Sequence, residues 1–374
     1  MRVVFLSCYF NHHQRYLSDA LAARCDYAFI ATTPYNSKRL ALGWKPDEEP
    51  DYVCHYDTDT SRANALLEQA EVVITGSAPE NLVEACIRRG QLVFRYSERP
   101  LKDGIEPLKY LPRLIKWHRQ NPSKGKIYLL CASAYTAGDY GKFGLFRRKA
   151  YRWGYFPQTV RYDDVQAEKK KNTILWAGRF IQWKHPERAL EVAKRLKAAG
   201  FDFHMKLIGA GELEASLGQQ AQELGDCVEL TGSMPPQQVR RAMEEAEIFL
   251  FTSDCHEGWG AVLNEAMNSG CAVVADAAIG SAPFLIRDGE NGLLYPTGDV
   301  DTLYNKVVSL LTDGENRQRL GRNACQTITE SWNGDTAAER LLVLAQRLKS
   351  GQQGSPFEDG PCSPAENLRE DWYQ

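Results

Sequence analysis

A repeated succession of short apolar run, glycine-containing turn and helical segment is the feature that most constrains the fold. Residues 246–251 are apolar and β-prone, Gly258-Trp259-Gly260 follows them, and 261–269 has a helical pattern that ends at Gly270. Strands alternate with helices in this way along the whole chain. We therefore expect an α/β protein built on doubly wound parallel sheets.

The length of the chain predicts more than one domain. At 374 residues it exceeds what a single core usually supports, and its apolar content of 43% is ordinary for a globular protein. A charge run soon after Pro157 marks a linker, which predicts a first domain over 1–157 and a second over 158–333. We expect a helix over 334–349. Residues 350–374 are rich in Gly, Pro, Ser and acids, which predicts a disordered tail.

The turn at 257–260 has the chemistry of an anion or sugar site. A helix that begins after Gly260 presents unpaired backbone N–H groups and partial positive charge, which suit a phosphate or a sugar oxygen. Glu257 precedes the turn, and Glu265 lies one helical turn inside the following helix. One carboxylate is placed to meet a hexose and the other a ribose. Two solvated surface charges are the alternative interpretation.

A second strand-loop-helix unit places two cations at an equivalent position. The strand 172–177 ends at Gly178, and a helix starts at Pro186. Arg179 and Lys184 therefore lie on the loop at the carboxyl end of a strand, where open α/β sheets bind ligands. Two fixed cations there neutralise a diphosphate without a metal, unless they serve only solubility.

Five segments carry a resemblance to a known family. They are Gly178–Lys184, Leu207–Gly211, Thr231–Ser233, Glu257–Met267 and Asp288–Gly292. In order and spacing they resemble the donor-binding domain of retaining family 4 glycosyltransferases of GT-B fold, of the bacterial saccharide-biosynthesis type. The resemblance implies two Rossmann-like domains that face each other across a crevice, and a helix over 334–349 that returns to the first domain.

The resemblance also implies roles for individual residues. Arg179 and Lys184 would hold the donor diphosphate, Glu257 the sugar and Glu265 the ribose, so that Arg179, Lys184 and Glu257 are the expected catalytic residues. The other expected donor-binding residues are Gly178, Gly232, Gly258, Trp259 and Gly260. The implied donor is a nucleoside diphosphate sugar, and UDP is its commonest nucleotide. No cofactor and no divalent metal are expected.

The acceptor side is predicted from the loops of the first domain. After the strand 3–7 the family commonly has a glycine pair, whereas this chain has His12 and His13. An imidazole changes charge near neutral pH, so either could meet the leaving phosphate or the acceptor, or face solvent as a helix-start residue. Glu98 and Arg99 follow another strand of this domain. They are candidates for an acceptor contact, the alternative being that they pair with each other.

A basic amphipathic segment over 108–119 predicts a helix with two possible partners. The net charge is −3, but Lys and Arg outnumber Asp and Glu in the first domain. In this segment and just beyond it, Lys109, Arg113, Lys116, His118, Arg119, Lys124 and Lys126 surround Leu108, Leu111, Leu114, Ile115 and Trp117. Such a helix lies on an anionic membrane surface or packs on a core. Nucleic acid is not expected, because no recognised nucleic-acid motif accompanies these residues.

Cysteine usage and the start of the chain favour a cytoplasmic protein, peripheral on the inner membrane face if the basic helix binds there. The ten cysteines are scattered singly, without the spacings of a zinc site or a disulfide framework. The opening apolar run is too short for a signal peptide, and no run approaches a membrane span.

Taken together, these features predict a retaining, metal-independent transfer of a hexosyl unit to a hydroxyl of a lipid-linked or growing saccharide. A sugar-nucleotide epimerase or phosphorylase of GT-B fold, or a non-catalytic GT-B scaffold, is the alternative. A dehydrogenase is disfavoured, because the first strand is not followed by G-x-G-x-x-G.

Overall fold

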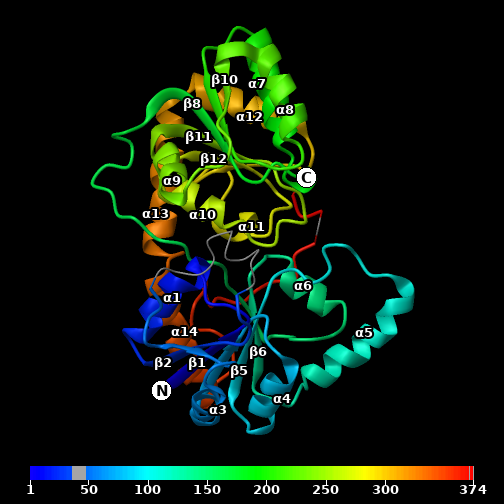
Figure 1. The fold of residues 1–374 in the computed structure, drawn as a ribbon. Coiled ribbons are helices and arrows are strands. Elements are labelled where there is room, and N and C mark those ends of the chain that lie inside the picture. Colours follow the sequence, from blue (N-terminus) through cyan, green and yellow to red (C-terminus); the bar gives the residue numbers. More distant parts are fainter. Residues whose placement is uncertain (36–47, 370, 374) are drawn as a thin grey trace. The chain divides into compact units, whose positions relative to one another are not determined.

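The chain forms two compact units (Figure 1). The computed structural model describes residues 1–35, 48–369 and 371–373. Unit 1 comprises Met1–Gln158 and Asn333–Arg369, and unit 2 comprises Thr159–Trp332 with the last described residues, 371–373.

Unit 1 is built on a seven-stranded sheet in the order β3-β2-β1-β4-β5-β6-β7. All of its ladders are parallel. The strands are β1 (Arg2–Ser7), β2 (Asp26–Ala31), β3 (Val53–His55), β4 (Val72–Thr75), β5 (Leu92–Ser97), β6 (Ile127–Cys131) and β7 (Ala150–Arg152). The strand order reverses between β1 and β4, which makes this pair the topological switch point of unit 1.

Helices flank the unit 1 sheet, except that α5 projects away from it (Figure 1). They are α1 (His12–Ala22), α3 (Thr60–Gln69), α4 (Glu80–Arg88), α5 (Pro107–Gln120), α6 (Thr136–Gly141) and α14 (Gly334–Lys349). The start of α1 is fixed by a capping box, in which the Asn11 side chain accepts from the His13 N–H and the Gln14 side chain accepts from the Asn11 N–H. The predicted C-terminal helix is α14, and it packs in unit 1 against α1.

Unit 2 is built on a six-stranded sheet in the order β10-β9-β8-β11-β12-β13, again with parallel ladders. The strands are β8 (Lys170–Ala177), β9 (His204–Ile208), β10 (Val228–Leu230), β11 (Ala246–Phe251), β12 (Ala272–Asp276) and β13 (Leu293–Tyr295). The strand order reverses between β8 and β11. The predicted fold class of doubly wound parallel sheets is confirmed for both units.

The unit 2 helices are α7 (Pro186–Ala198), α8 (Glu214–Leu224), α9 (Pro236–Glu245), α10 (Ala261–Asn268), α11 (Ala282–Leu285), α12 (Val300–Thr312) and α13 (Gly314–Glu330). Every residue of β11 is buried, as a near-continuous apolar strand covered on both faces should be. Proline at the first position of α7 and Gly200 just beyond its end give the limits that the sequence predicted.

Residues 350–369 are ordered against unit 1, so the prediction of a disordered tail is wrong for them. Two backbone hydrogen bonds join this segment to the edge strand β7: the Cys362 N–H donates to the Arg152 carbonyl, and the Arg152 N–H donates to the Ser363 carbonyl, both at 2.8 Å. Cys362 and Ser363 are fully buried. The composition predicted disorder because the segment has no core of its own, but an open sheet edge supplies its partners.

All ten cysteines are free thiols. Within residues 1–35, 48–369 and 371–373, no helix is long and apolar enough to cross a membrane.

Candidate functional site

The predicted donor residues of unit 2 meet at the switch point between β8 and β11. Gly178 and Arg179 follow β8, and a short 3-10 helix, η1 (Gln182–Lys184), leads to α7. The loop after β11 runs from Thr252 to Gly260 and enters α10. Because β8 and β11 are hydrogen-bonded neighbours, their carboxyl-terminal loops lie side by side.

Lys184 and Glu257 form an ion pair between these two loops. The Lys184 Nζ lies 2.5 Å from the Glu257 Oε2, and about one tenth of each side chain is exposed. The same carboxylate oxygen accepts from the Ser253 hydroxyl at 2.9 Å. One cation and one carboxylate are thus held together at the carboxyl edge of the sheet.

Thr252 and Trp176 fix the backbone that carries Lys184. The Trp176 Nε1 donates to the Thr252 hydroxyl at 2.9 Å. That hydroxyl lies 2.8 Å from the Lys184 carbonyl oxygen and donates to it. Both Trp176 and Thr252 are buried, so the position of Lys184 is set from the core of unit 2.

Arg179 is the exposed cation of the site. Its guanidinium lies over the Trp183 ring at 5.7 Å, and the Lys184 Nζ lies 5.0 Å from the same ring. The Arg179 guanidinium forms no hydrogen bond or ion pair with any residue that the structure describes. Trp183 therefore brings the two cations together while leaving the Arg179 donors available to an anion.

The turn before α10 presents backbone donors as predicted. Within the described part of the chain, the N–H groups of Gly258, Trp259 and Gly260 donate to no protein acceptor. Gly260 adopts a left-handed conformation with φ of 82°, and a Cβ there would lie 2.5 Å from the Phe251 ring. Glycine is required at this position, because a side chain would displace the turn that carries Glu257.

Trp259 contributes its backbone but not its side chain. The indole is buried, donates to the Asn264 Oδ1 at 2.9 Å and packs against Trp332 and Phe284. The ring anchors the turn to the core, so only the Trp259 N–H group is left to meet a donor, and that role stays a prediction.

Glu265 lies in α10 without a partner for its carboxylate among the described residues. Burial raises the pKa of this carboxyl, and the nearby Arg240 acts in the opposite direction. A carboxylate that is desolvated and unpaired is poised to accept hydrogen bonds from a ligand that brings hydroxyl donors.

Gly178 and Gly232 belong to a network of backbone hydrogen bonds that joins the loops after β8, β9 and β10. The Gly178 N–H donates to the Ile208 carbonyl, and the Gly209 N–H donates to the Gly232 carbonyl at 2.9 Å. A Cβ on Gly209 would lie 1.8 Å from the Gly178 carbonyl oxygen. The glycines let three strand-end loops pack backbone to backbone.

Asp254, which is not among the site residues predicted from sequence, links the same two loops. Its N–H donates to the Trp183 carbonyl, and its carboxylate contacts His256 at 2.8 Å and His185 at 3.2 Å. Hydrogen bonds from the imidazoles lower the pKa of Asp254 against its burial, and the bond to Glu187 raises the pKa of His185. Asp254, Cys255 and His256 also bring three potential metal ligands within 4.8 Å of one another.

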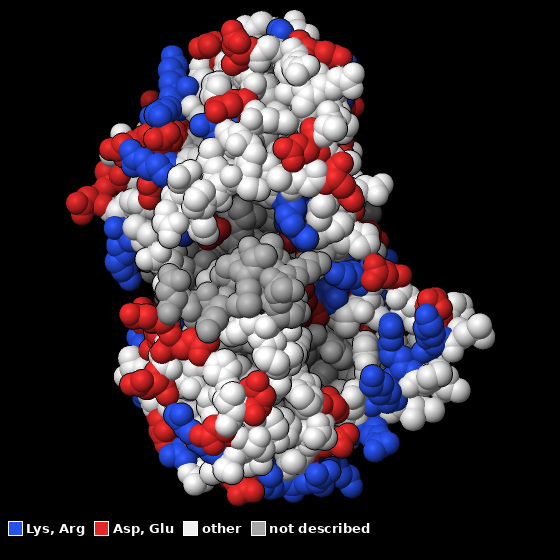
Figure 2. Space-filling view, viewed as in Figure 1, with Lys and Arg blue, Asp and Glu red and all other residues white. Residues whose placement is uncertain are grey.

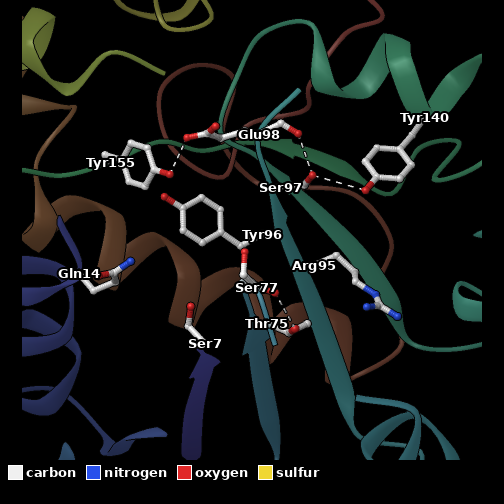
Figure 3. A pocket seen from close by; sticks show the side chains of 11 residues that line it. Ser7, Gln14, Thr75, Ser77, Arg95, Tyr96, Ser97, Glu98, Tyr140 and Tyr155 are labelled. Atoms are coloured by element: carbon white, nitrogen blue, oxygen red, sulfur yellow. Dashed lines mark hydrogen bonds between the residues drawn. The ribbon is translucent and has the colours of Figure 1, made fainter. Parts of the chain in front are cut away.

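A pocket of about 420 Å³ lies in unit 1 at the switch point between β1 and β4 (Figure 3). Its walls carry hydroxyl, amide and carboxylate groups, from Ser7, Gln14, Thr75, Ser77, Ser97, Tyr96, Tyr140, Tyr155 and Glu98. The polar lining at the carboxyl ends of parallel strands suits a ligand with many hydroxyl groups.

Of the predicted acceptor-side residues, Glu98 lines this pocket. Its Oε1 accepts from the Tyr155 hydroxyl at 2.6 Å, as Figure 3 shows. Arg99 is buried, and its Nε lies 3.2 Å from the buried Asp139 carboxylate. Asp139 also accepts from the Leu101 N–H, so Arg99 holds the loop after β5 and is not placed to contact an acceptor.

His12 and His13 lie at the first turn of α1. Their ring centres are 4.0 Å apart, and the His13 ring lies 5.3 Å from that of Tyr155. Burial, with His12 beside it, lowers the pKa of His13 to about 3, and burial also lowers the pKa of His12. Both imidazoles are therefore neutral near pH 7. The His13 Nδ1 is buried and has no hydrogen-bond partner among the described residues.

Sequence reasoning missed several residues of these sites. Trp183 lay inside a quoted motif but was not assigned a role, and Thr252, Ser253 and Asp254 were overlooked because small polar residues after a strand are common. Tyr155 is separated from Glu98 by 57 residues, so no local pattern could have paired them.

Comparisons with known proteins agree with this geometry. Residues 161–327 match the family model described as "Glycosyl transferases group 1". The chain is 36% identical over 204 residues to the amylovoran biosynthesis glycosyltransferase AmsK of Erwinia amylovora, covering 53% of this chain and 50% of that protein. It is 27% identical over 192 residues to a putative colanic acid biosynthesis glycosyltransferase, WcaL, of Salmonella typhimurium, covering 49% and 47%. The chain thus spans about half the length of these curated relatives.

A solved structure extends the likeness to both units. The crystal structure of Anabaena HepE in complex with UDP matches 94% of this chain and 100% of that chain, with a TM-score of 0.65 at 16% identity. At this identity the likeness concerns the fold. Residues 161–327 therefore form a domain of the glycosyl transferases group 1 family, on a chain that has the GT-B fold.

Proposed function

We propose that this chain is a retaining glycosyltransferase that moves a hexosyl unit from a nucleoside diphosphate sugar to an acceptor hydroxyl of a lipid-linked or growing saccharide. The observation that carries the proposal is the convergence of Arg179, the Lys184–Glu257 pair and the unpaired N–H groups of the 258–260 turn at the β8/β11 switch point. The relatives named for amylovoran and colanic acid biosynthesis support a saccharide acceptor.

The donor would lie with its diphosphate against the two cations. Negative charge builds on the phosphate as the bond to the sugar breaks, and preorganised donors stabilise it. Arg179 offers a planar fork without a competing carboxylate, whereas Lys184 is already paired. We infer that the arriving phosphate shares Lys184 with Glu257, which draws the carboxylate toward the sugar.

The two glutamates would act on different parts of the donor. Glu257 is held by Lys184 and Ser253, and so is oriented to accept from hexose hydroxyls. Glu265 is unpaired among the described residues, and ribose hydroxyls would supply the hydrogen bonds that its buried carboxylate lacks. This assignment makes Glu257 a determinant of turnover and Glu265 a determinant of donor affinity.

We infer that no divalent metal is required for transfer. Two side-chain cations and the N-terminal end of α10 provide positive potential where other enzymes use a metal ion. The first nucleotide to test is UDP, since UDP is bound by HepE in its crystal structure.

The unit 1 pocket is the proposed acceptor site. Its hydroxyl-rich walls match a saccharide, and Glu98, whose Oε1 accepts from the Tyr155 hydroxyl, contributes the carboxylate of its lining (Figure 3). The neutral His13 lies beside Tyr155, which places an imidazole near one wall.

Contact with an anionic membrane surface is proposed for α5, in a cytoplasmic protein. Leu108, Leu111 and Ile115 are 92%, 60% and 62% exposed, although Leu114 and Trp117 of the same helix pack on the core. Blue Lys and Arg side chains gather over this helix in Figure 2. Exposed apolar residues among cations suit a headgroup layer, and such a surface would supply a lipid-linked acceptor.

The test is a thermal-shift screen of UDP, GDP, ADP, TDP and NAD, each with EDTA and again with magnesium, followed by determination of the anomeric configuration of the product by NMR. A ligand that binds only the folded state raises the melting temperature. We expect a shift with one diphosphate that EDTA leaves unchanged, that Arg179→Ala abolishes and that the matched exposed variant Lys194→Ala retains.

The alternatives give different results. No shift with any nucleotide would indicate a scaffold, and turnover without an acceptor or with inorganic phosphate would indicate an epimerase or phosphorylase. A product of inverted configuration would refute retention, and loss of the shift with EDTA would refute metal independence.

A further inference from the structure

A cavity of about 540 Å³ lies in unit 1, and none of the residues proposed for donor or acceptor lines it. Its walls come from the segment between α6 and β7 and from the C-terminal segment between Gly354 and Asn367. It shares no lining residue with the hydroxyl-lined pocket at the β1/β4 switch point.

One part of this cavity is apolar. Ala137, Leu145, Ala150, Pro364 and Ala365 contribute to it, and small side chains such as the three alanines leave the space open. Leu145 also belongs to the buried cluster on which α5 rests. An apolar wall of this kind accommodates part of a hydrocarbon chain or a similar group.

Tyr151 also lines this cavity, but its hydroxyl is not accessible from it. The residue is only 1% exposed, and its hydroxyl is enclosed in the protein and makes no hydrogen bond with any described residue. Burial raises the pKa of Tyr151, and the titratable side chains that act on it are Tyr128, Cys362 and Arg347. Tyr151 therefore contributes to the wall of the cavity and not to the binding of an anion.

Two adjacent arginines supply positive charge to the cavity. Arg147 and Arg148 line it, and neither forms a hydrogen bond or ion pair with any residue in the described ranges. The flanking lysines are engaged elsewhere: Lys142 contacts Asp139, and Lys149 donates to the Ser123 carbonyl. Among the described residues of this segment, the two guanidinium groups are thus the cations that have no partner.

The backbone of this segment is strained where it lines the cavity. Phe146 and Arg148 have φ values of 55° and 57°, in the left-handed region that residues other than glycine avoid. Strain of this kind persists where the surrounding structure imposes it, and it concentrates at ligand sites. Here it fixes the course of the chain at the two arginines.

We propose that this cavity binds an anionic amphiphile, with a phosphate monoester held by Arg147 and Arg148 and an apolar chain along the alanine and proline wall. Guanidinium groups bind phosphate oxygens through paired hydrogen bonds. The site is distinct from the proposed donor and acceptor sites and does not depend on them.

The residues around the cavity favour a lipid as the molecule that carries this phosphate and apolar chain. Helix α5 rests on Phe143 and Leu145, and Leu145 also lines the cavity. The exposed apolar residues of α5 therefore belong to the same part of unit 1 as the cavity. A phosphorylated lipid would bring its headgroup to the arginines from the surface that α5 contacts.

The experiment measures melting temperature and binding with three soluble probes. Dihexanoyl phosphatidate carries a phosphate monoester on short chains, dihexanoyl phosphatidylcholine carries the same chains without net charge, and glucose 6-phosphate carries the phosphate without chains. We expect stabilisation by phosphatidate below its micelle concentration, and at least tenfold weaker binding of the other two.

Two variants separate a binding role from a structural one. The double variant R147Q/R148N should lose the phosphatidate shift, and asparagine at 148 tolerates the left-handed backbone. Tyr151→Phe should leave phosphatidate binding and the melting temperature of the free protein nearly unchanged, because it removes an enclosed hydroxyl that has no described partner. The matched variant R113Q on α5 should retain the shift.

Several results would overturn the proposal. An equal shift with phosphatidylcholine would show that the cavity does not recognise the anionic group. A full shift with glucose 6-phosphate would show that the ligand needs no apolar chain. A phosphatidate shift that survives in R147Q/R148N would place the ligand elsewhere. The nucleotide shift of unit 2 should be unchanged in these variants, so a failure here is separable from a failure of the proposed transferase function.

Discussion

Lys184 and Glu257 are separated by 73 residues along the chain, yet their charged groups lie 2.5 Å apart at the β8/β11 switch point. The pair joins the loop after one strand to the loop after its neighbour. It holds a cation and a carboxylate together at one edge of the sheet, where we propose that they meet the phosphate and the sugar of a donor. The proposed donor binding and the connection of the two loops therefore depend on the same contact.

Replacement of Glu257 should affect turnover more than donor affinity. In Glu257→Ala the sugar loses the carboxylate that orients it, and Lys184 loses the partner that positions it for the leaving phosphate. We expect kcat to fall roughly 100-fold to 1,000-fold, the effect of losing one preorganised group in the transition state. Steady-state kinetics with varied donor gives the result. An equal loss in KM for the donor would contradict the assigned role.

Replacement of Glu265 should weaken donor binding and change the pH dependence of stability. The folded-state pKa of this carboxyl is raised above its ordinary value of 4.5, so the folded protein holds the proton more tightly than the unfolded chain. Stability should fall as pH rises from about 4.5 through the raised folded value, and the loss then persists at neutral pH. Glu265→Gln should abolish this decline and be more stable than wild type at pH 7.

The same variant should bind the donor roughly 10-fold to 100-fold more weakly, because hydrogen bonds to a charged acceptor contribute about 1.5–3 kcal/mol. Urea titrations between pH 4 and pH 8 and nucleotide binding measure the two effects. Glu214→Gln, at an exposed glutamate of α8, is the control. A variant that is less stable at pH 7 would show that the carboxylate is structural.

Local pattern predicted the fold, and it predicted that the residues of the candidate donor site lie on neighbouring loops, because each strand-turn-helix unit is continuous in sequence. Pro186 and Gly200 delimit α7, and parallel strands bring their loops to one edge. Given that topology, Arg179, Lys184 and Glu257 had to be neighbours. The sequence pattern could not reveal that the Trp259 ring points inward, because the packing partner Trp332 lies far along the chain.

Contacts between distant segments account for the other differences. Arg99 appeared to be free for an acceptor, but Asp139 occupies its guanidinium from 40 residues away. The C-terminal segment appeared disordered, but the edge of β7 gives Cys362 and Ser363 backbone partners. In both cases the local composition was interpreted correctly, and a distant partner changed the outcome.

Gly260 should be intolerant of any side chain. In Gly260→Ala the new Cβ would lie 2.5 Å from the Phe251 ring and 3.1 Å from the Glu257 Cγ, on a backbone with φ of 82°. We expect a loss of about 1–3 kcal/mol in the free energy of unfolding from overpacking, with activity reduced through Glu257. Gly200→Ala has a similar φ of 78° but no atom within 4 Å of its Cβ, so it reports the backbone strain alone. Equal destabilisation of the two variants would show that the Phe251 contact relaxes without cost.

Helix α5 should mediate binding to anionic vesicles. A triple variant, L108S/L111S/I115S, removes the three exposed apolar side chains while leaving Leu114 and Trp117 on the core. We expect binding to vesicles that contain phosphatidylglycerol to fall sharply with little change in melting temperature.

The cations should contribute separately and in a salt-dependent way. Replacing Lys109, Arg113 and Lys116 by glutamine should cost about 1 kcal/mol per residue near the headgroups, and added salt should remove most of that difference. Co-sedimentation with vesicles at several salt concentrations measures both effects. Val343→Ser changes an exposed apolar residue of α14, 46% accessible, and should bind like wild type. Unchanged binding of both the triple serine and the triple glutamine variants would show that the membrane, if bound, is bound elsewhere.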